Sequence, residues 1–272
     1  MNRYLSIVIP AYNEAKILPV TLECLRVFLS EQPFAAEVII VDDGSTDRTS
    51  AVLQEWTPAF ECLRVLRTPV NSGKGASIRR GVLASRGECV FVADADLPGS
   101  PEDILRLLAA LAQGAAVAIA SRRPAPMSAA PSPLRYIASK IYRGMVRAIL
   151  GLPVRDTQCG FKAFLREPLL PIVEGLQSNG FSFDVEFLFA AWKQGLAIKE
   201  VEFDVVERRR IQHAILLQSP RMIIDLLRIR LTAGRVLRSA RTRPVEHEPS
   251  LNPTKGLERG PNRQGSLANH EN

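Results

Sequence analysis

Residues 89–96 read Cys-Val-Phe-Val-Ala-Asp-Ala-Asp, an apolar run that ends in two carboxylates one residue apart. A short apolar run of this kind is typical of a strand buried on both faces. Side chains two residues apart leave a strand on the same face, so Asp94 and Asp96 are expected in the crevice where open α/β sheets bind ligands. They suit a divalent cation shared with a diphosphate, because such cations prefer carboxylate and phosphate oxygens. A polar turn that caps the next helix is the alternative.

Similar apolar runs recur on both sides of this stretch, and helical patterns separate them. Strands are expected at residues 5–9, 38–41, 63–66, 90–93 and 117–120, and helices near 17–29, 47–56, 75–85 and 101–113. This alternation predicts an α/β fold with a mostly parallel sheet flanked by helices.

Polar residues follow the first two of these strands. Residues 10–14 read Pro-Ala-Tyr-Asn-Glu, and residues 42–47 read Asp-Asp-Gly-Ser-Thr-Asp. Gly44 allows a tight turn, and Ser45 or Thr46 is expected to cap the next helix. Capping leaves the two adjacent carboxylates unexplained, and a carboxylate at the end of a strand is placed to accept hydrogen bonds from a ribose or base.

Residues 71–75, Asn-Ser-Gly-Lys-Gly, resemble a phosphate loop without matching either standard pattern. Thr68 stands where a Walker loop needs glycine, and Ile78 stands where the dinucleotide fingerprint needs its third glycine. Lys74 and a helix N-terminus can still support a phosphate group. A plain glycine turn before a helix is an equal alternative.

Two later stretches are rich in polar groups. Residues 155–162 read Arg-Asp-Thr-Gln-Cys-Gly-Phe-Lys, and residues 183–186 read Phe-Asp-Val-Glu ahead of an apolar helical segment. Asp184 and Glu186 either cap that helix or place a carboxylate at a reaction centre, and the pattern does not separate the two.

The charge of the chain is concentrated near its C-terminal end. The formal net charge of the 272 residues is +7, and ten arginines but only two acids lie between Glu207 and Arg243. Such a stretch indicates an anionic partner, either nucleic acid or a phospholipid surface, and an ordinary solvated basic face is the alternative. Stacking aromatics are not interleaved with the arginines, which disfavours nucleic acid.

Two basic amphipathic helices are expected outside the alternating region, after a proline-rich loop at 122–133. The apolar positions of the first helix are Leu134, Ile137, Ala138, Ile141, Met145, Ala148 and Ile149, with Arg135, Lys140, Arg143 and Arg147 beside them. Those of the second helix, near 221–238, are Met222, Leu226, Ile229, Ala233 and Val236. Each helix either lies on a membrane surface or packs on the sheet.

Neither a membrane-spanning segment nor a secretory leader is expected, since no apolar run reaches about 18 residues. The four cysteines lie far apart, which disfavours disulfides or a zinc site and fits a reducing cytosol.

In its ordered motifs the chain resembles the family 2 glycosyltransferases, which have a GT-A fold. The resemblance rests on residues 6–14, 41–47, 71–75 and 94–96, in that order. Residues 155–162 and 183–186 are similar, more narrowly, to dolichyl-phosphate β-glucosyltransferases and their prokaryotic polyprenyl-phosphate relatives. The resemblance to the family covers residues 3–240. It implies one GT-A domain over 1–240, with a nucleotide-sugar-binding half (1–125) and an acceptor and membrane-contacting half (126–240). Residues 243–272 are expected to be a disordered tail.

The resemblance implies an inverting enzyme that moves a hexose, glucose from UDP-glucose, to a polyprenyl or dolichyl phosphate. It also implies Mg²⁺ or Mn²⁺, no nucleic acid, and a peripheral location on the cytoplasmic face of an anionic membrane. A transferase for a non-lipid acceptor, or a non-catalytic membrane-surface module on a degenerate GT-A fold, is the alternative.

The resemblance also assigns roles to individual residues. Nucleotide-sugar binding falls to Pro10, Tyr12, Glu14, Asp42, Gly73, Lys74 and Asp94, and metal binding to Asp94 and Asp96. Catalytic roles fall to Asp96, Arg122, Asp156, Gln158, Lys162, Asp184 and Glu186.

The sequence departs from the family pattern at two places. Arg208, Arg209 and Arg210 stand where relatives carry a Gly-Ser-Lys or similar phosphate-contacting segment, and they are assigned to the nucleotide sugar in its place. Pro98 stands where mannosyl-phosphate synthases have glutamine, which disfavours a mannosyl donor.

Overall fold

The computed structural model describes residues 5–97, 99–122, 133–157, 159–203 and 223–234. The strands are β1 (Leu5–Ala11), β2 (Ala36–Asp42), β3 (Leu63–Arg67), β4 (Cys89–Val92), β5 (Val117–Arg122), β6 (Lys162–Leu165) and β7 (Ile198–Phe203). The helices are α1 (Leu18–Ser30), α2 (Thr49–Trp56), α3 (Lys74–Ala84), α4 (Asp103–Ala112), α5 (Pro133–Leu150), α6 (Arg166–Gly175) and α7 (Phe183–Lys193), with a short 3₁₀ turn η1 (Thr57–Ala59). Residues 223–234 form a further helix.

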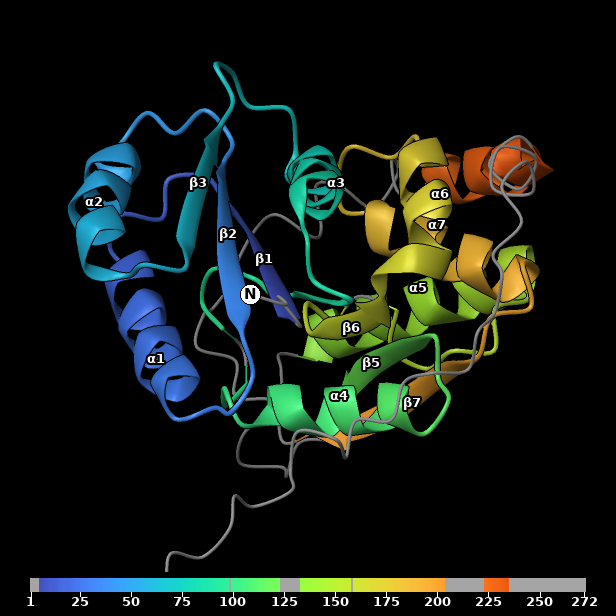
Figure 1. The fold of residues 1–272 in the computed structure, drawn as a ribbon. Coiled ribbons are helices and arrows are strands. Elements are labelled where there is room, and N and C mark those ends of the chain that lie inside the picture. The colour runs from blue at the N-terminus through green and yellow to red at the C-terminus, as the bar shows by residue number, and fades with distance from the viewer. Residues whose placement is uncertain (1–4, 98, 123–132, 158, 204–222, 235–272) are drawn as a thin grey trace, which may run out of the picture.

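The strands form one sheet in the order β3-β2-β1-β4-β6-β5-β7 (Figure 1). The pairs β1–β2, β1–β4, β2–β3 and β5–β7 are parallel, which confirms the expected α/β class. Among the described strands, β6 alone is antiparallel to its neighbours, β4 and β5. Neither β6 nor β7 was expected from the sequence, because β6 is short and begins with a lysine, and β7 carries charged residues among its apolar ones.

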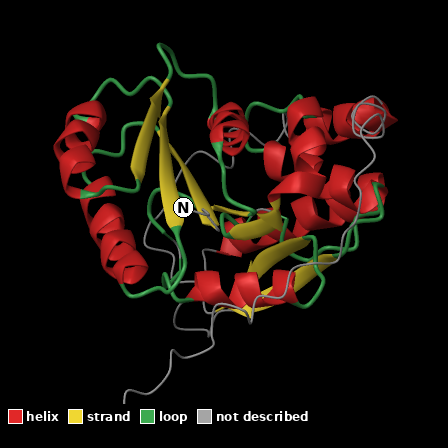
Figure 2. Cartoon of the chain, in the orientation of Figure 1, coloured by secondary structure: helices red, strands yellow, loops and turns green. Residues whose placement is uncertain are grey.

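The central strands are apolar along their whole length because both faces of the sheet are covered. Along β1, Ile7 and Ile9 join the core beneath α1 and α4, whereas Val8 joins the core beneath α3 and α7. In Figures 1 and 2, α1 and α2 lie on one side of β1–β3 and α3 lies on the other. Strands buried on both faces leave only their ends free for polar side chains.

The two basic amphipathic helices pack on the core through faces that differ from the expected ones in part. On α5 the buried side chains are Tyr142, Val146 and Leu150, while Ile141 and Ala148 are exposed. The apolar face expected for α5 was therefore wrong in part, because Met145 and Ile149 pack against the core but Ile141 and Ala148 do not. In the last described helix Leu226 and Ile229 are buried as the pattern suggests, but against the protein core.

Among the described helices, none is both long and apolar enough to cross a membrane. The proline-rich segment 123–132, the arginines at 208–210, Met222, Val236 and the tail at 243–272 lie outside the described residues.

Candidate active site

A cleft of about 920 Å³ opens where β1, β2 and β4 end. Its lining includes Pro10, Tyr12, Glu14, Asp43, Gly73, Lys74, Asp94, Asp96, Gln177, Ser178, Asn179, Gly180, Phe181, Glu186, Asp225, Arg228 and Thr232. Ligands of open α/β sheets bind at this position, beyond the carboxyl ends of the strands. Eight of the residues assigned from the sequence thus line one cleft.

Lys74 and Asp94, which both line this cleft, form an ion pair. The Lys74 Nζ is 2.5 Å from Asp94 Oδ1, and the two side chains are 19% and 35% exposed. Burial alone would lower the pKa of Lys74, but the negative charges of Asp94, Asp184 and Asp96 raise it above its ordinary value. Burial alone would raise the pKa of Asp94, but Lys74 lowers it. Both groups are therefore charged at neutral pH.

The chemistry of Asp94 and Asp96 fits a divalent cation that arrives with its own oxygen ligands. Both carboxylates reach the cleft. No cluster of three or more His, Cys, Asp or Glu side chains able to hold a metal occurs within the described part of the chain. Mg²⁺ commonly uses one or two protein carboxylates together with substrate phosphates and water. The pair fits such a shared site better than a site built from protein ligands alone.

Asp43 fixes the loop that carries Lys74. Its carboxylate accepts hydrogen bonds from Ser72 N and Oγ, at 2.9 and 2.6 Å, and from Gly73 N at 2.8 Å. Burial would raise the pKa of Asp43, but these hydrogen bonds lower it. Gly73 has φ +100°, which favours glycine. Sequence reasoning noted Asp43 but did not assign it to the site, although two adjacent strand-end residues point to opposite faces.

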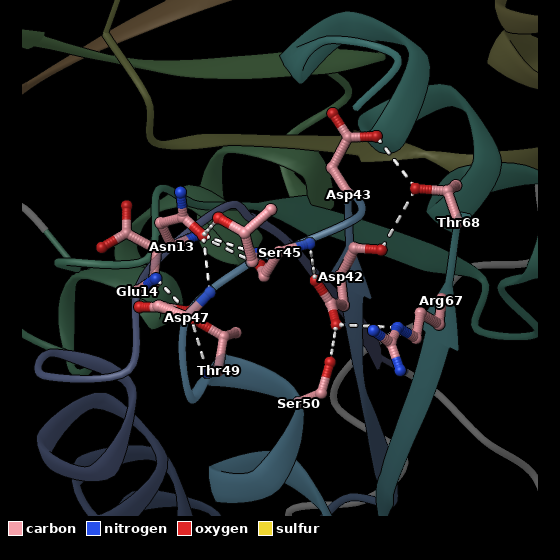
Figure 3. A network of polar contacts seen from close by, with 11 residues as sticks. Asn13, Glu14, Asp42, Asp43, Ser45, Asp47, Thr49, Ser50, Arg67 and Thr68 are labelled. Atoms are coloured by element: carbon pink, nitrogen blue, oxygen red, sulfur yellow. Dashed lines mark hydrogen bonds and ion pairs between the residues drawn. The ribbon is translucent and has the colours of Figure 1, made fainter. Parts of the chain in front are cut away.

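Asp42, which was assigned to the nucleotide sugar, lies fully buried and does not line the cleft. Its carboxylate accepts hydrogen bonds from Ser45 N at 2.9 Å and Ser50 Oγ at 2.5 Å, and Arg67 Nε is 3.6 Å away (Figure 3). In this arrangement Asp42 organises the turn between β2 and α2.

The capping role expected for Ser45 and Thr46 was wrong. α2 begins after Arg48 without a side-chain cap. Ser45 Oγ instead accepts a hydrogen bond from Asn13 N at 3.0 Å, and Asn13 Oδ1 accepts one from Thr46 N at 2.9 Å (Figure 3). Thr49 Oγ1 accepts Glu14 N at 2.8 Å in the same network. These bonds join the loop after β1 to the loop after β2, so they hold Tyr12 and Glu14 at the cleft.

Lys162 and Asp184 form a buried ion pair beside the cleft. Lys162 Nζ is 3.0 Å from Asp184 Oδ1, and it also donates a hydrogen bond to the carbonyl of Cys159. Both line a small neighbouring cavity with Phe183 and Phe187, and neither lines the main cleft. Asp156 is likewise buried and outside the cleft lining. None of these three side chains lines the main cleft.

Glu186 holds a loop that sequence reasoning missed. Glu186 lies in the first turn of α7, and its carboxylate accepts hydrogen bonds from Gln177 N at 3.1 Å and Ser178 N at 2.7 Å. Arg79 of α3 donates to Leu176 O at 2.6 Å. Residues 177–181 therefore form one wall of the cleft. No local pattern marks this loop, because only tertiary contacts bring it to the site.

The other residues assigned from the sequence are Arg122, Gln158, Arg208, Arg209 and Arg210, and none of them is in the cleft lining given by the described residues. Arg122 is the last residue of β5, where its backbone pairs with Phe203. Gln158, Arg208, Arg209 and Arg210 lie outside the described residues.

Comparisons with known proteins agree with this arrangement. A family model described as glycosyl transferase family 2 matches residues 6–171. A dolichyl-phosphate beta-glucosyltransferase of Saccharomyces cerevisiae is 31% identical over 248 residues, which cover 84% of this chain and 74% of the relative. The human dolichyl-phosphate beta-glucosyltransferase is 34% identical over 221 residues, covering 76% and 68%.

Solved structures with this fold include glucosyl-3-phosphoglycerate synthase from Mycobacterium tuberculosis. Its complex with Mn²⁺, UDP and glucosyl-3-phosphoglycerate superposes with a TM-score of 0.65 at 23% identity, covering 85% of this chain and 80% of that one. A complex of the same enzyme with Mn²⁺, UDP and phosphoglyceric acid gives a TM-score of 0.64 at 22% identity, with coverages of 85% and 78%. At this identity the likeness concerns the fold.

Proposed function

The chain belongs to glycosyl transferase family 2, and we propose that it transfers glucose from UDP-glucose to dolichyl phosphate or a related polyprenyl phosphate, with inversion, at a membrane surface. It is a glycosyltransferase and not a non-catalytic binding module. The observation that carries the proposal is the single cleft in which Asp94, Asp96 and Lys74 lie between the loop after β1 and the 223–234 helix.

The donor is assigned to the end of the cleft formed by Pro10, Tyr12 and Glu14. Tyr12 is 45% exposed there, so its ring is available to pack against a nucleoside. The loop held by Asp43 brings Lys74 and the N-terminus of α3 toward the diphosphate. The positive charge of Lys74 and the positive end of the α3 helix dipole favour an anion there.

Asp94 and Asp96 are the residues that would hold Mg²⁺ or Mn²⁺. When bound, the cation supplies positive charge that stabilises the departing nucleoside diphosphate. Lys74 adds a second positive charge at the same place. The acceptor phosphate is already anionic, so its attack on the anomeric carbon needs no strong general base. Asp184 is accordingly assigned to positioning, since it is paired with Lys162. In-line displacement inverts the anomeric centre.

The acceptor is assigned to the end of the cleft formed by the 223–234 helix. Arg228 and Thr232 line the cleft there. On the outer side of the same helix, Ile224, Leu227 and Leu231 are 65%, 50% and 85% exposed. Arg228 suits the acceptor phosphate, and the apolar residues suit a lipid chain or the membrane that carries it.

Charge on the neighbouring helix supports membrane binding. Lys140, Arg143 and Arg147 of α5 are exposed, and Ile141 beside them is 56% exposed. Apolar side chains surrounded by basic ones are typical of helices that lie on anionic membranes. The proposed location is therefore peripheral, on the cytoplasmic face.

The test is transfer of labelled glucose from UDP-glucose to dolichyl phosphate in detergent with Mn²⁺ or Mg²⁺. Asp94→Asn and Asp96→Asn should each lower turnover about 100-fold, by analogy with the loss of one charge-stabilising group. Asp103→Asn on α4 is the matched control, because Asp103 pairs with Arg106 outside the cleft. Turnover that survives Asp96→Asn would refute the metal role.

A further inference from the structure

Lys74 forms an ion pair with Asp94, one of the two carboxylates to which the proposed function assigns the metal. Its Nζ lies 2.5 Å from Asp94 Oδ1, a distance typical of a strong, charge-assisted hydrogen bond. A divalent cation on Asp94 would lie close to this ammonium and would be repelled by it. The ammonium of Lys74 therefore competes with the divalent cation for the carboxylate of Asp94.

The backbone on both sides of Lys74 is fixed, whereas its side chain is long enough to turn. Gly73 N donates to Asp43 Oδ2 at 2.8 Å, and Gly75 N donates to Asn179 O at 2.7 Å. Lys74 Nζ also lies 5.8 Å from the centre of the Phe181 ring, which is part of the cleft lining. The ammonium can therefore exchange Asp94 for an anion in the cleft without movement of the loop.

Asp94 has little freedom to leave the ammonium. Gly160 packs directly against it, and a Cβ at position 160 would lie 2.7 Å from Asp94 Cγ. The carboxylate is therefore confined between Gly160 on one side and Lys74 on the other. A change of partner at Asp94 must come from Lys74.

We propose that Lys74 keeps Asp94 from binding a divalent cation until a nucleoside diphosphate enters the cleft, and that it then passes its ammonium to the diphosphate and frees Asp94. This rests on the proposed function and adds a binding order to it. Without the nucleotide, Lys74 neutralises part of the charge of Asp94 and Asp96. With the nucleotide, the phosphates take up Lys74 and supply oxygen ligands. Metal and nucleotide must then strengthen each other's binding by the same factor.

The test is Mn²⁺ binding, measured by the electron paramagnetic resonance signal of free Mn²⁺ with and without UDP. Wild-type protein should bind Mn²⁺ weakly alone and at least about tenfold more tightly with UDP, within the usual range of coupling between two sites. Lys74→Met should bind Mn²⁺ alone about tenfold more tightly than wild type and lose most of the gain from UDP. Arg80→Met removes the same charge from an exposed position on α3 and should behave as wild type.

Two further variants keep the test independent of one substitution. Lys74→Arg retains the charge and should retain weak binding of Mn²⁺ alone, whereas Lys74→Gln should resemble Lys74→Met. If UDP strengthens Mn²⁺ binding in wild type but neither neutral variant binds Mn²⁺ alone more tightly, the role of Lys74 is wrong and the proposed function stands. If UDP gives wild type no gain in Mn²⁺ affinity, the metal role in the proposed function fails together with this inference.

Discussion

Asp43 accepts a hydrogen bond from the backbone N–H of Gly73 at 2.8 Å, which ties the end of β2 to the loop that carries Lys74. Ser72 adds two further hydrogen bonds to the same carboxylate. The position of the lysine therefore depends on a carboxylate that need not touch the ligand itself.

Asp43→Ala should weaken UDP binding by about tenfold, because the loss of hydrogen bonds to a carboxylate costs about 1.5–3 kcal/mol and lets the loop that carries Lys74 move. Isothermal titration with UDP and Mn²⁺ measures this change. Asp103→Ala is the control, since Asp103 lies on α4 away from the cleft. Unchanged UDP affinity in Asp43→Ala would show that the loop is held by other contacts.

Acid stability should depend on Glu37, at the opposite end of the sheet from the cleft. Burial alone would raise the pKa of Glu37, but hydrogen bonds from Arg64, Ser6 and the backbone N–H of Arg86 lower it below its ordinary value of 4.5. A lowered folded pKa means that the folded state resists protonation. The contribution of Glu37 is thus present above the ordinary pKa and is lost as the pH falls through the folded pKa.

Glu37→Gln should therefore lower the free energy of unfolding at pH 7 by about 1–3 kcal/mol and flatten its fall on acidification. Urea unfolding at a series of pH values between neutrality and pH ~3 checks this. Glucosyl transfer by the folded variant should equal that of wild type. An acid slope as steep as that of wild type would assign the effect to other carboxylates.

The Lys162–Asp184 pair separates a positioning role from direct participation in the reaction. Both side chains are almost fully buried, at 3% and 8% exposure. Removing one partner of a buried pair leaves an uncompensated charge and costs about 3–5 kcal/mol. Lys162→Met and Asp184→Leu should each destabilise the protein by about that amount, while the double variant should recover part of the loss.

Thermal or denaturant unfolding of the single and double variants gives the coupling between the two residues. Fully additive losses of stability would contradict the pairing. If the double variant folds well and still transfers glucose at more than a tenth of the wild-type rate, both residues act by positioning.

Membrane binding should depend on the outer face of the 223–234 helix. Leu227→Glu combined with Leu231→Glu should reduce flotation with anionic vesicles more than about tenfold, because burying each leucine contributes about 1.5–3 kcal/mol. Val20→Glu is the control, since Val20 is 57% exposed on α1. Equal losses of flotation in the two proteins would contradict a specific membrane-facing surface.

Much of the fold could be predicted from the sequence because the continuous apolar pattern of the central strands is typical of a buried parallel sheet. Residues such as Ile7, Val8 and Ile9 are apolar in succession, and burial on both faces of a parallel sheet is the simplest way to accommodate them. β6 could not be predicted in this way because its first residue, Lys162, is a charged side chain whose buried ion-pair partner, Asp184, lies 22 positions away.

The site was predictable where motifs end a strand and unpredictable where tertiary contacts build it. Asp94, Asp96 and Lys74 reach the cleft as expected from their places after β4 and before α3. Choosing between Asp42 and Asp43 requires the orientation of each side chain, which the sequence does not contain. Likewise, residues 177–181 become a wall only because Glu186 and Arg79 hold them there.

The acceptor is the central claim, and one competition experiment addresses it directly. Purified protein would be given labelled UDP-glucose and Mn²⁺ with equal concentrations of dolichyl phosphate and 3-phosphoglycerate, and the label would be followed into the organic and aqueous phases. We expect the label in a lipid-linked product whose formation is lost in Asp94→Asn. Label that appears only in a water-soluble phosphorylated product, or no lipid-linked product at any concentration of dolichyl phosphate, would contradict the account.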